Sequence, residues 1–307
     1  MRYTLKNLLS LAGLNSRLSI LIYHRVTDAE AFDQQMSWLS AYFRTITLHE
    51  AVKRLRQNKL QPRTACITFD DGYADNAEVA LPILQKYNLS ATFFVSTGFL
   101  NGGRMWNDTV IELVHQALGP ILNLSKMGLG QFKINTISQR QQTINSLLDK
   151  LKYLPLDTRQ LKVDEMCSYV PARLPNNLMM TSEQVKKLYV AGMEIGGHTV
   201  NHPILARTEE NVARAEIANG KEELESIIRA PVKFFAYPNG KPGQDYLSDH
   251  TKIVRDLGFE AAVSTSHGAI KSSGDLYQLP RFTPWDQGQV RFMLRMAQNM
   301  LKKPEMV

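Results

Sequence analysis

Cysteine is scarce in this chain of 307 residues, which contains only Cys66 and Cys167, far apart in the sequence. Two distant thiols do not form the disulfide framework of small secreted domains, so the composition favours a reducing compartment. Long apolar runs are also missing, since no stretch reaches the roughly 20 residues that a transmembrane helix needs. The chain is long enough to bury a substantial core, as one large α/β domain or two smaller ones.

The first 17 residues lack the continuous apolar core and small-residue cleavage site of a secretory signal, because Lys6, Asn7 and Ser10 interrupt the leucines. Residues 3–12 have the spacing of a short amphipathic helix, which we expect to pack on the domain rather than to lie on a membrane surface. The missing signal predicts a cytoplasmic protein, with the inner face of the membrane as the alternative location.

Long blocks of one charge sign are absent, although the formal net charge is +7. Dispersed basic residues are not typical of nucleic-acid-binding proteins, so no nucleic acid partner is expected. The positive excess suits an anionic glycan or an anionic membrane face, and it suits solubility alone equally well. A peripheral membrane contact therefore stays open, and nothing in the composition gives the oligomeric state.

The most informative stretch is residues 65–73, in which an apolar, β-prone run ends at Asp70, Asp71 and Gly72. We interpret the run as a buried strand whose carboxyl end presents two acids, where the chemistry of α/β folds lies. Two adjacent carboxylates are costly to bury unless a cation or a proton lies between them. The stretch therefore predicts either a metal site or a solvated strand end.

His198 and His202 follow a second predicted strand at residues 192–196. Imidazoles four residues apart share one face of a helix or converge from a tight loop. Two imidazoles and one carboxylate can hold a divalent metal and leave positions open for water and substrate. An Asp-Asp-Gly sequence alone is most often a turn, and a pair of histidines is often a helix surface. Because the acids and the histidines both lie at predicted strand ends, their combination favours a functional site over chance.

Strands and helices alternate over most of the chain, which implies a parallel sheet. A count of about seven βα units predicts a deformed, TIM-like (β/α)7 barrel. Residues 101–177 break the alternation, and we expect a helical insertion there within a single catalytic domain of residues 1–307. The strands are expected at residues 18–23, 65–69, 91–95, 192–196, 233–237, 261–265 and 277–282.

Residues 68–72 (Thr-Phe-Asp-Asp-Gly) and 198–202 (His-Thr-Val-Asn-His) resemble the first two motifs of the polysaccharide deacetylases, carbohydrate esterase family 4. The resemblance covers about residues 19–99 and 180–285, in the expected order. It implies a metal-dependent hydrolase that removes N-acetyl groups from an amino-sugar-containing glycan or glycan precursor. The default ion is zinc, with cobalt or nickel as alternatives. The implied ligands are Asp71, His198 and His202.

The same resemblance implies roles for other residues. Asp70 would be the general base, and His24, at the end of the first strand, would protonate the leaving amine. In some family members a Tyr-His at that place supplies the imidazole that others carry near the carboxyl terminus. A third motif at Tyr237, Pro238 and Asn239 would shape the cleft wall and supply an N–H group to the oxyanion.

Ala236 departs from the family pattern, because many members carry there an arginine that orients the base. Arg281 could reach the mouth of the barrel and replace it, and a surface or core-edge ion pair is an equally good interpretation. Trp285 is either a sugar-stacking platform or a core residue. His267 lies near the place of the family's last histidine motif but lacks its apolar neighbours, so it is not assigned.

Two other functions stay open besides deacetylation of a glycan. An amidohydrolase of the same fold, acting on a small non-sugar amide or ureide, would have a closed pocket rather than a cleft several sugars long. An inactive glycan-binding module is disfavoured by the intact acids and histidines, because decay tends to strike such residues first. The expected partner is an N-acetylated glycan.

Overall fold

The computed structural model describes residues 17–271, 273–286 and 288–307, so the helix expected at residues 3–12 lies outside the described residues. The chain divides into two compact units, one containing residues up to 101 and from 180 onward, the other containing residues 102–179. Among the described helices, none combines the length and the apolar character that crossing a membrane requires. The assignment of residues 1–307 to one catalytic domain stays a prediction.

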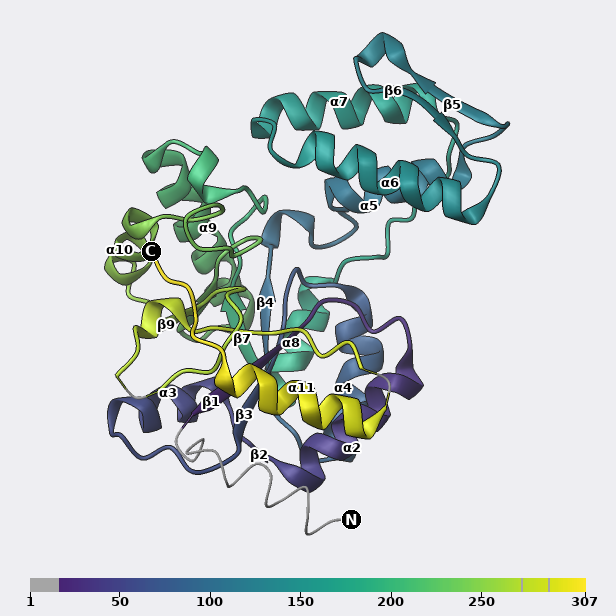
Figure 1. Cartoon of the computed structure of the whole chain (residues 1–307). Coiled ribbons are helices and arrows are strands. Elements are labelled where there is room, and N and C mark those ends of the chain that lie inside the picture. Colours follow the sequence, from purple (N-terminus) through teal and green to yellow (C-terminus); the bar gives the residue numbers. More distant parts are fainter. Residues whose placement is uncertain (1–16, 272, 287) are drawn as a thin grey trace. The chain divides into compact units, whose positions relative to one another are not determined.

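A curled sheet of seven strands organises the first unit, in the order β1-β3-β4-β7-β8-β9 with β2 beside β3 (Figure 1). Every pairing in this sheet is parallel, so all the strands present their carboxyl ends at the same edge. The expected deformed (β/α) barrel is therefore confirmed. The strands are β1 (Leu18–Tyr23), β2 (Arg44–Thr45), β3 (Thr64–Phe69), β4 (Ala91–Val95), β7 (Glu194–Gly197), β8 (Phe234–Ala236) and β9 (Ala261–Val263).

Helices connect these strands and bury their apolar faces against the sheet. A π-helical turn, η1 (Asn76–Ala80), precedes α4, and Pro82 falls in the first turn of α4, where proline is tolerated. The α-helices of this unit are α2 (Ala29–Tyr42), α3 (Leu48–Arg56), α4 (Leu81–Lys86), α8 (Ser182–Val190), α9 (Glu210–Ile228), α10 (Ser248–Asp256) and α11 (Gln289–Leu301).

Residues 277–282, predicted as a short strand or edge, form no continuous strand. The arrangement that they adopt instead matters for the site. Residues Leu276–Gln278 form a 3-10 turn, η5, and the extended residues after it make only single bridges. Leu279 pairs with Val263 of β9, whereas Phe282 pairs with Leu21 of β1. The segment between them thus connects the two edge strands and carries Arg281 into the interior of the unit.

The second unit has its own apolar core and consists of three helices and a hairpin. The hairpin was not part of the expected helical insertion. Its strands are antiparallel, and Gly128 in the connection has φ 72°, a conformation that favours glycine. The elements are α5 (Trp106–Gln116), β5 (Ile121–Leu124), β6 (Gly130–Lys133), α6 (Ile137–Lys152) and α7 (Leu156–Tyr169).

Candidate active site

The structure brings the three predicted metal ligands together at the carboxyl ends of β3 and β7. Oδ1 of Asp71 lies 3.4 Å from Nε2 of His198 and 3.4 Å from Nε2 of His202. The three candidate ligand atoms all lie within 4.8 Å of one another. Two ligands bound tetrahedrally to zinc at about 2.0–2.1 Å are about 3.3–3.4 Å apart, so this spacing fits one divalent cation.

His198 is oriented by a hydrogen bond on the side of its ring away from Asp71. Its Nδ1 lies 2.7 Å from the carbonyl oxygen of Ala236, the last residue of β8. Because a carbonyl oxygen only accepts, we assign the proton to Nδ1, which leaves a lone pair on Nε2 facing the carboxylate. This is the tautomer that a metal-binding imidazole requires, and it is fixed by the backbone of the neighbouring strand.

Asp70 is paired with Arg281, whose side chain is completely buried. Nη1 and Nη2 of the guanidinium donate to the two carboxylate oxygens, at 2.6 and 2.7 Å. The same guanidinium donates to the Ser264 carbonyl at 3.0 Å and to the Thr68 hydroxyl at 3.1 Å. Arg281 therefore reaches the strand ends and is not a surface residue, and its contact with Asp70 is a buried ion pair. Its role in orienting the base stays a prediction.

The charges of this cluster shift its pKa values in a consistent way. Burial alone would raise the pKa of Asp71, but the neighbouring imidazoles of His198 and His202 hold that pKa well below its usual range. Burial opposes ionisation of Asp70 as well, yet the charges of Arg281 and His198 lower its pKa. Conversely, the two carboxylates outweigh burial and raise the pKa of His198. Both acids are therefore carboxylates at neutral pH.

His24 follows β1 and is exposed at the same edge of the sheet. The N–H of Asp70 donates to the carbonyl of Tyr23 at 2.9 Å, so His24 and Asp70 follow neighbouring strands side by side. The amide nitrogen of Asn76 donates to the His24 carbonyl at 2.8 Å and fixes the backbone there. The structure thus brings His24 to the site, and its role as general acid stays a prediction.

The third motif contributes backbone rather than the tyrosine side chain. Tyr237 is fully buried, and its hydroxyl donates to the Tyr277 carbonyl at 3.0 Å. The Tyr237 N–H donates to the Val263 carbonyl at 3.2 Å, and Pro238 has no N–H. Within the described residues the Asn239 N–H has no acceptor, so it is the group of this motif that is available to an oxyanion.

The site lies on loops with an unusual backbone conformation. Left-handed conformations of non-glycine residues cost free energy and collect at functional sites, where the surrounding structure maintains them. Here they occur in the loops that follow β3, β7 and β8. The φ values are 76° at Asp71, 64° at Thr199, 51° at His202 and 58° at Asn239.

Two residues that sequence reasoning missed hold these loops. Ser96, after β4, donates its N–H to the Asp71 carbonyl at 3.2 Å and its hydroxyl to the His198 carbonyl at 2.9 Å. Buried Glu216 of α9 accepts from the N–H groups of Val200 and Asn201 at 3.0 and 2.8 Å. An acid on the apolar face of α9 was the available signal for Glu216. Ser96 gave none.

Trp285 and His267 are both surface residues. Trp285 is 67% exposed, so the interpretation as a core residue is wrong, and the sugar-stacking platform stays a prediction. His267 is also exposed and lines a separate hollow with Lys302 and Lys303.

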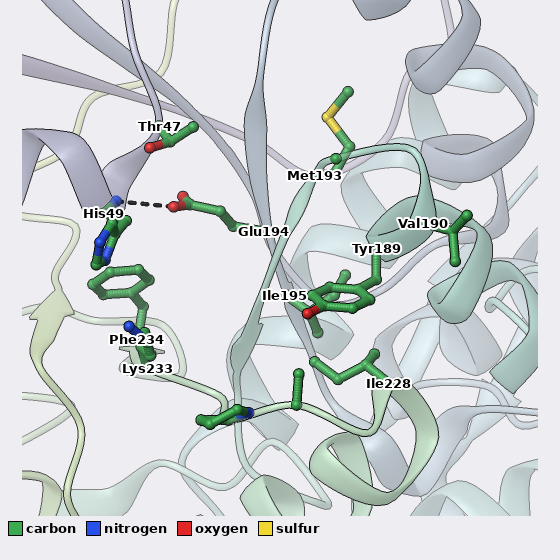
Figure 2. Close-up of a pocket in the computed structure, with 13 residues that line it drawn as sticks. Thr47, His49, Tyr189, Val190, Met193, Glu194, Ile195, Ile228, Lys233 and Phe234 are labelled. Carbon is green, nitrogen blue, oxygen red and sulfur yellow. Dashed lines mark hydrogen bonds between the residues drawn. The ribbon is translucent and has the colours of Figure 1, made fainter.

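A larger hollow, of about 620 Å³, lies at the opposite end of the sheet (Figure 2). It is lined largely by apolar side chains, around the first residues of β7 and β8 and the start of α3. Its carboxylate, Glu194, is fully engaged, because it accepts from the Leu48 and His49 N–H groups and the Thr92 hydroxyl. Glu194 therefore caps α3, and this hollow brings together no metal ligands.

Comparisons with known proteins place the chain in a family. The family profile described as polysaccharide deacetylase matches residues 57–119 and 159–262, more than half of the chain. Bacillus subtilis YxkH, named for the same family, is 22% identical over 276 residues, which cover 87% of this chain and 71% of that protein. A poly-β-1,6-N-acetyl-D-glucosamine N-deacetylase of Staphylococcus epidermidis is 34% identical over 85 residues, which span only 27% of this chain and 29% of that enzyme.

Two solved structures have the same fold. IcaB from Ammonifex degensii aligns with a TM-score of 0.61 at 20% identity, covering 92% of this chain and 97% of that one. The Streptococcus pyogenes deacetylase PplD aligns with a TM-score of 0.58 at 22% identity, covering 88% and 92%.

Proposed function

Because the chain belongs to the polysaccharide deacetylase family, we propose that it removes N-acetyl groups from an amino-sugar-containing glycan or glycan precursor by hydrolysis. The observation that carries the proposal is the convergence of Asp71, His198 and His202 beside the ion pair of Asp70 and Arg281. The staphylococcal relative, whose name states an N-acetylated glucosamine polymer as its substrate, supports this substrate class.

Asp71, His198 and His202 would hold one divalent cation, since their spacing and the tautomer of His198 suit it. When bound there, the cation supplies Lewis-acid chemistry that lowers the pKa of water from ~15.7 towards ~7 and polarises an amide carbonyl. We propose zinc as the ion, and a set of two imidazoles and one carboxylate accommodates cobalt or nickel as well.

Asp70 takes the proton from the attacking water. Its two oxygens accept from Arg281, but each carboxylate oxygen has a second lone-pair direction that stays available to the water. The bidentate pair fixes the carboxylate plane, and it keeps the group ionised in a buried setting. The base is therefore charged and oriented before the substrate arrives.

The remaining groups serve the carbonyl oxygen and the leaving nitrogen. As water adds to the amide carbon, the Asn239 N–H donates to the developing oxyanion. The C–N bond then breaks, and the His24 imidazole gives its proton to the leaving nitrogen. The products are acetate and a free amine on the sugar.

Metal analysis combined with acetate release tests this proposal. The purified protein is assayed on a panel of N-acetylated glycans and on a small amide and a ureide, with Asp70→Asn as the control. We expect about one metal per chain in both proteins and acetate release from a glycan by the wild type, reduced about 10²–10⁴-fold in the variant. Turnover of only the small amide or ureide would reject the glycan substrate. Bound metal without any turnover would favour a binding module.

The location stays a proposal, namely the cytoplasm or the inner face of the membrane. It is supported by the two free cysteines, of which Cys66 is buried in the core. An enzyme placed there would act on precursor or lipid-linked glycans rather than on finished cell wall. Cell fractionation tests it, and recovery of the protein from the medium would reject it.

A further inference from the structure

A second hollow, of about 520 Å³, lies beyond the carboxyl ends of β8 and β9. Lys241 and Pro242 of the loop after β8 form one side, and residues 265–267 after β9 form another. The third side is the segment after α11, with Lys302, Lys303 and Glu305. None of these residues has a role in the reaction proposed above.

The charge in this hollow is positive and largely uncompensated. Its lysines, Lys241, Lys302 and Lys303, form no ion pair within the described residues, and Glu305 is the one carboxylate in the lining. The pKa of His267 is lowered by partial burial and then by nearby cations, against the opposite effect of Glu305. Positive charge therefore prevails over the single acid at this place.

The hollow shares a wall with the proposed oxyanion turn. The N–H of Thr265, which lines the hollow, donates to the Gly240 carbonyl at 2.9 Å. Its hydroxyl donates to the carbonyl of Asn239 at 2.7 Å, the residue whose N–H is proposed above to bind the oxyanion. A group bound in the hollow would thus lie one loop away from the acetamido group that is hydrolysed.

The segment that carries Lys302 and Lys303 is fixed rather than loosely attached. The N–H of Glu305 donates to the Ser266 hydroxyl at 2.7 Å, and the Asn299 amide donates to the Gly268 carbonyl at 2.8 Å. Gly268 has no space for a side chain, because a Cβ there would lie 3.1 Å from the Lys302 carbonyl. The backbone that carries the two exposed lysines is thereby held at a defined place, so binding has to order only their side chains.

We propose that this hollow binds an anionic group of the glycan, a phosphate or a carboxylate, next to the sugar that is deacetylated. The inference rests on the proposed function and specifies that the glycan substrate carries a negative charge. Lysine ammonium groups bind oxyanions as point charges with up to three donors each. Because Lys241, Lys302 and Lys303 are exposed, their attraction for an anion should weaken as the salt concentration rises.

The first test measures binding without catalysis, with inorganic phosphate as the probe. Wild type, Lys302→Gln/Lys303→Gln and the matched control Lys186→Gln/Lys187→Gln are titrated by calorimetry at low ionic strength. The control removes the same charge from an adjacent, exposed pair on α8. We expect about tenfold weaker phosphate binding in the first variant and wild-type binding in the control. Equal binding by all three proteins would overturn the proposal.

The second test uses turnover. N-acetylglucosamine oligosaccharides of one length are compared in neutral form, with a phosphate monoester and with a uronate. We expect a lower KM for at least one anionic form, and we expect Lys302→Gln/Lys303→Gln to raise the anionic-to-neutral KM ratio about tenfold. The two anionic arms decide between phosphate and carboxylate, and equal KM values for all three would overturn the inference.

The two proposals fail in different ways. Turnover of the neutral glycan without any anion preference rejects the anion site and leaves the deacetylase intact. Phosphate binding that is lost in the Lys302/Lys303 variant, with no acetate released from any oligosaccharide, supports the anion site and rejects the deacetylase.

Discussion

Each end of the seven-stranded sheet has an acidic side chain that is buried or half-buried, but the two acids have different partners. At the amino end, Glu194 accepts from the Leu48 N–H at 2.8 Å and from the His49 N–H at 2.9 Å, and Figure 2 shows the second of these hydrogen bonds. Its negative charge thus lies at the positive end of the dipole of α3. At the carboxyl end, Asp71 faces two imidazole nitrogens at 3.4 Å, a distance that suits a shared ion better than a direct hydrogen bond.

The difference shows which features of this fold mark a reactive site. The amino end has a hollow of about 620 Å³, yet its acid is satisfied by a helix cap. The carboxyl end combines converging ligands, shifted pKa values and left-handed loop residues such as Asp71 and His202. The size of a hollow is therefore a poorer guide here than the arrangement of donors and the backbone that holds them.

The largest effect is expected from Asp71→Asn, which removes the carboxylate between the two imidazoles. Metal content should fall from about one ion per chain towards none. Acetate release should fall at least about 10³-fold, because several kcal/mol of transition-state stabilisation are lost with the cation. Elemental analysis and an acetate assay check this, with Glu194→Gln as the matched change at the amino end. Full metal content and activity in Asp71→Asn would contradict the assignment of the ligand.

Arg281→Lys should give the next largest effect, since it keeps the charge but loses the two-pronged pairing with Asp70. We expect kcat to fall about 10²-fold with unchanged metal content, in line with the effect of general-base catalysis. Arg281→Met would leave the buried Asp70 without a partner and should destabilise the fold by about 3–5 kcal/mol. Unfolding by urea and steady-state kinetics measure the two effects. A folded Arg281→Lys with wild-type kcat would limit Arg281 to stability.

The sequence predicts the metal ligands because each lies within a local pattern. Asp70 and Asp71 end an apolar run, and His198 and His202 follow another. Because the carboxyl ends of parallel strands meet at one edge of a sheet, the four residues are expected there together. Arg281 could not be decided in this way. Its partner Asp70 is 211 residues away in the sequence, and the contact between the two side chains depends on how residues 279–282 connect β9 to β1.

The errors have the same origin. The apolar residues around Leu279 and Phe282 resemble a strand, but each pairs with a different edge of the sheet through a single bridge. Ser96 was missed because its partners are backbone groups of the site loops, which leave no pattern in the sequence. For Glu216 the sequence offers an acid on an apolar helix face, but it does not indicate the backbone groups that this acid binds. The sequence thus predicts the residues that do the chemistry better than those that hold them.

A matched pair of changes, Glu216→Gln and Glu194→Gln, sharpens the contrast between the two ends. Each replaces a carboxylate that accepts from two backbone N–H groups, so each should cost about 1–2 kcal/mol of unfolding free energy. Only Glu216 supports the loop between the two metal-binding histidines. We expect about tenfold weaker metal binding in Glu216→Gln and unchanged binding in Glu194→Gln. Competition with a chelator measures it, and equal affinities would show that α9 does not tune the site.

The smallest effect is expected at Val190, which lines the amino-end hollow and is 77% exposed. Val190→Ala removes little buried surface and improves helix propensity at the last position of α8, so unfolding free energy should change by less than about 0.5 kcal/mol. Steady-state kinetics test whether this hollow binds the substrate. If it bound the glycan, Val190→Ala would remove apolar contact with the sugar and KM would rise. We expect an unchanged KM, since the reaction and its ligands belong to the opposite end of the sheet. A severalfold increase in KM would instead mean that the substrate reaches both ends, and the division argued above would be wrong.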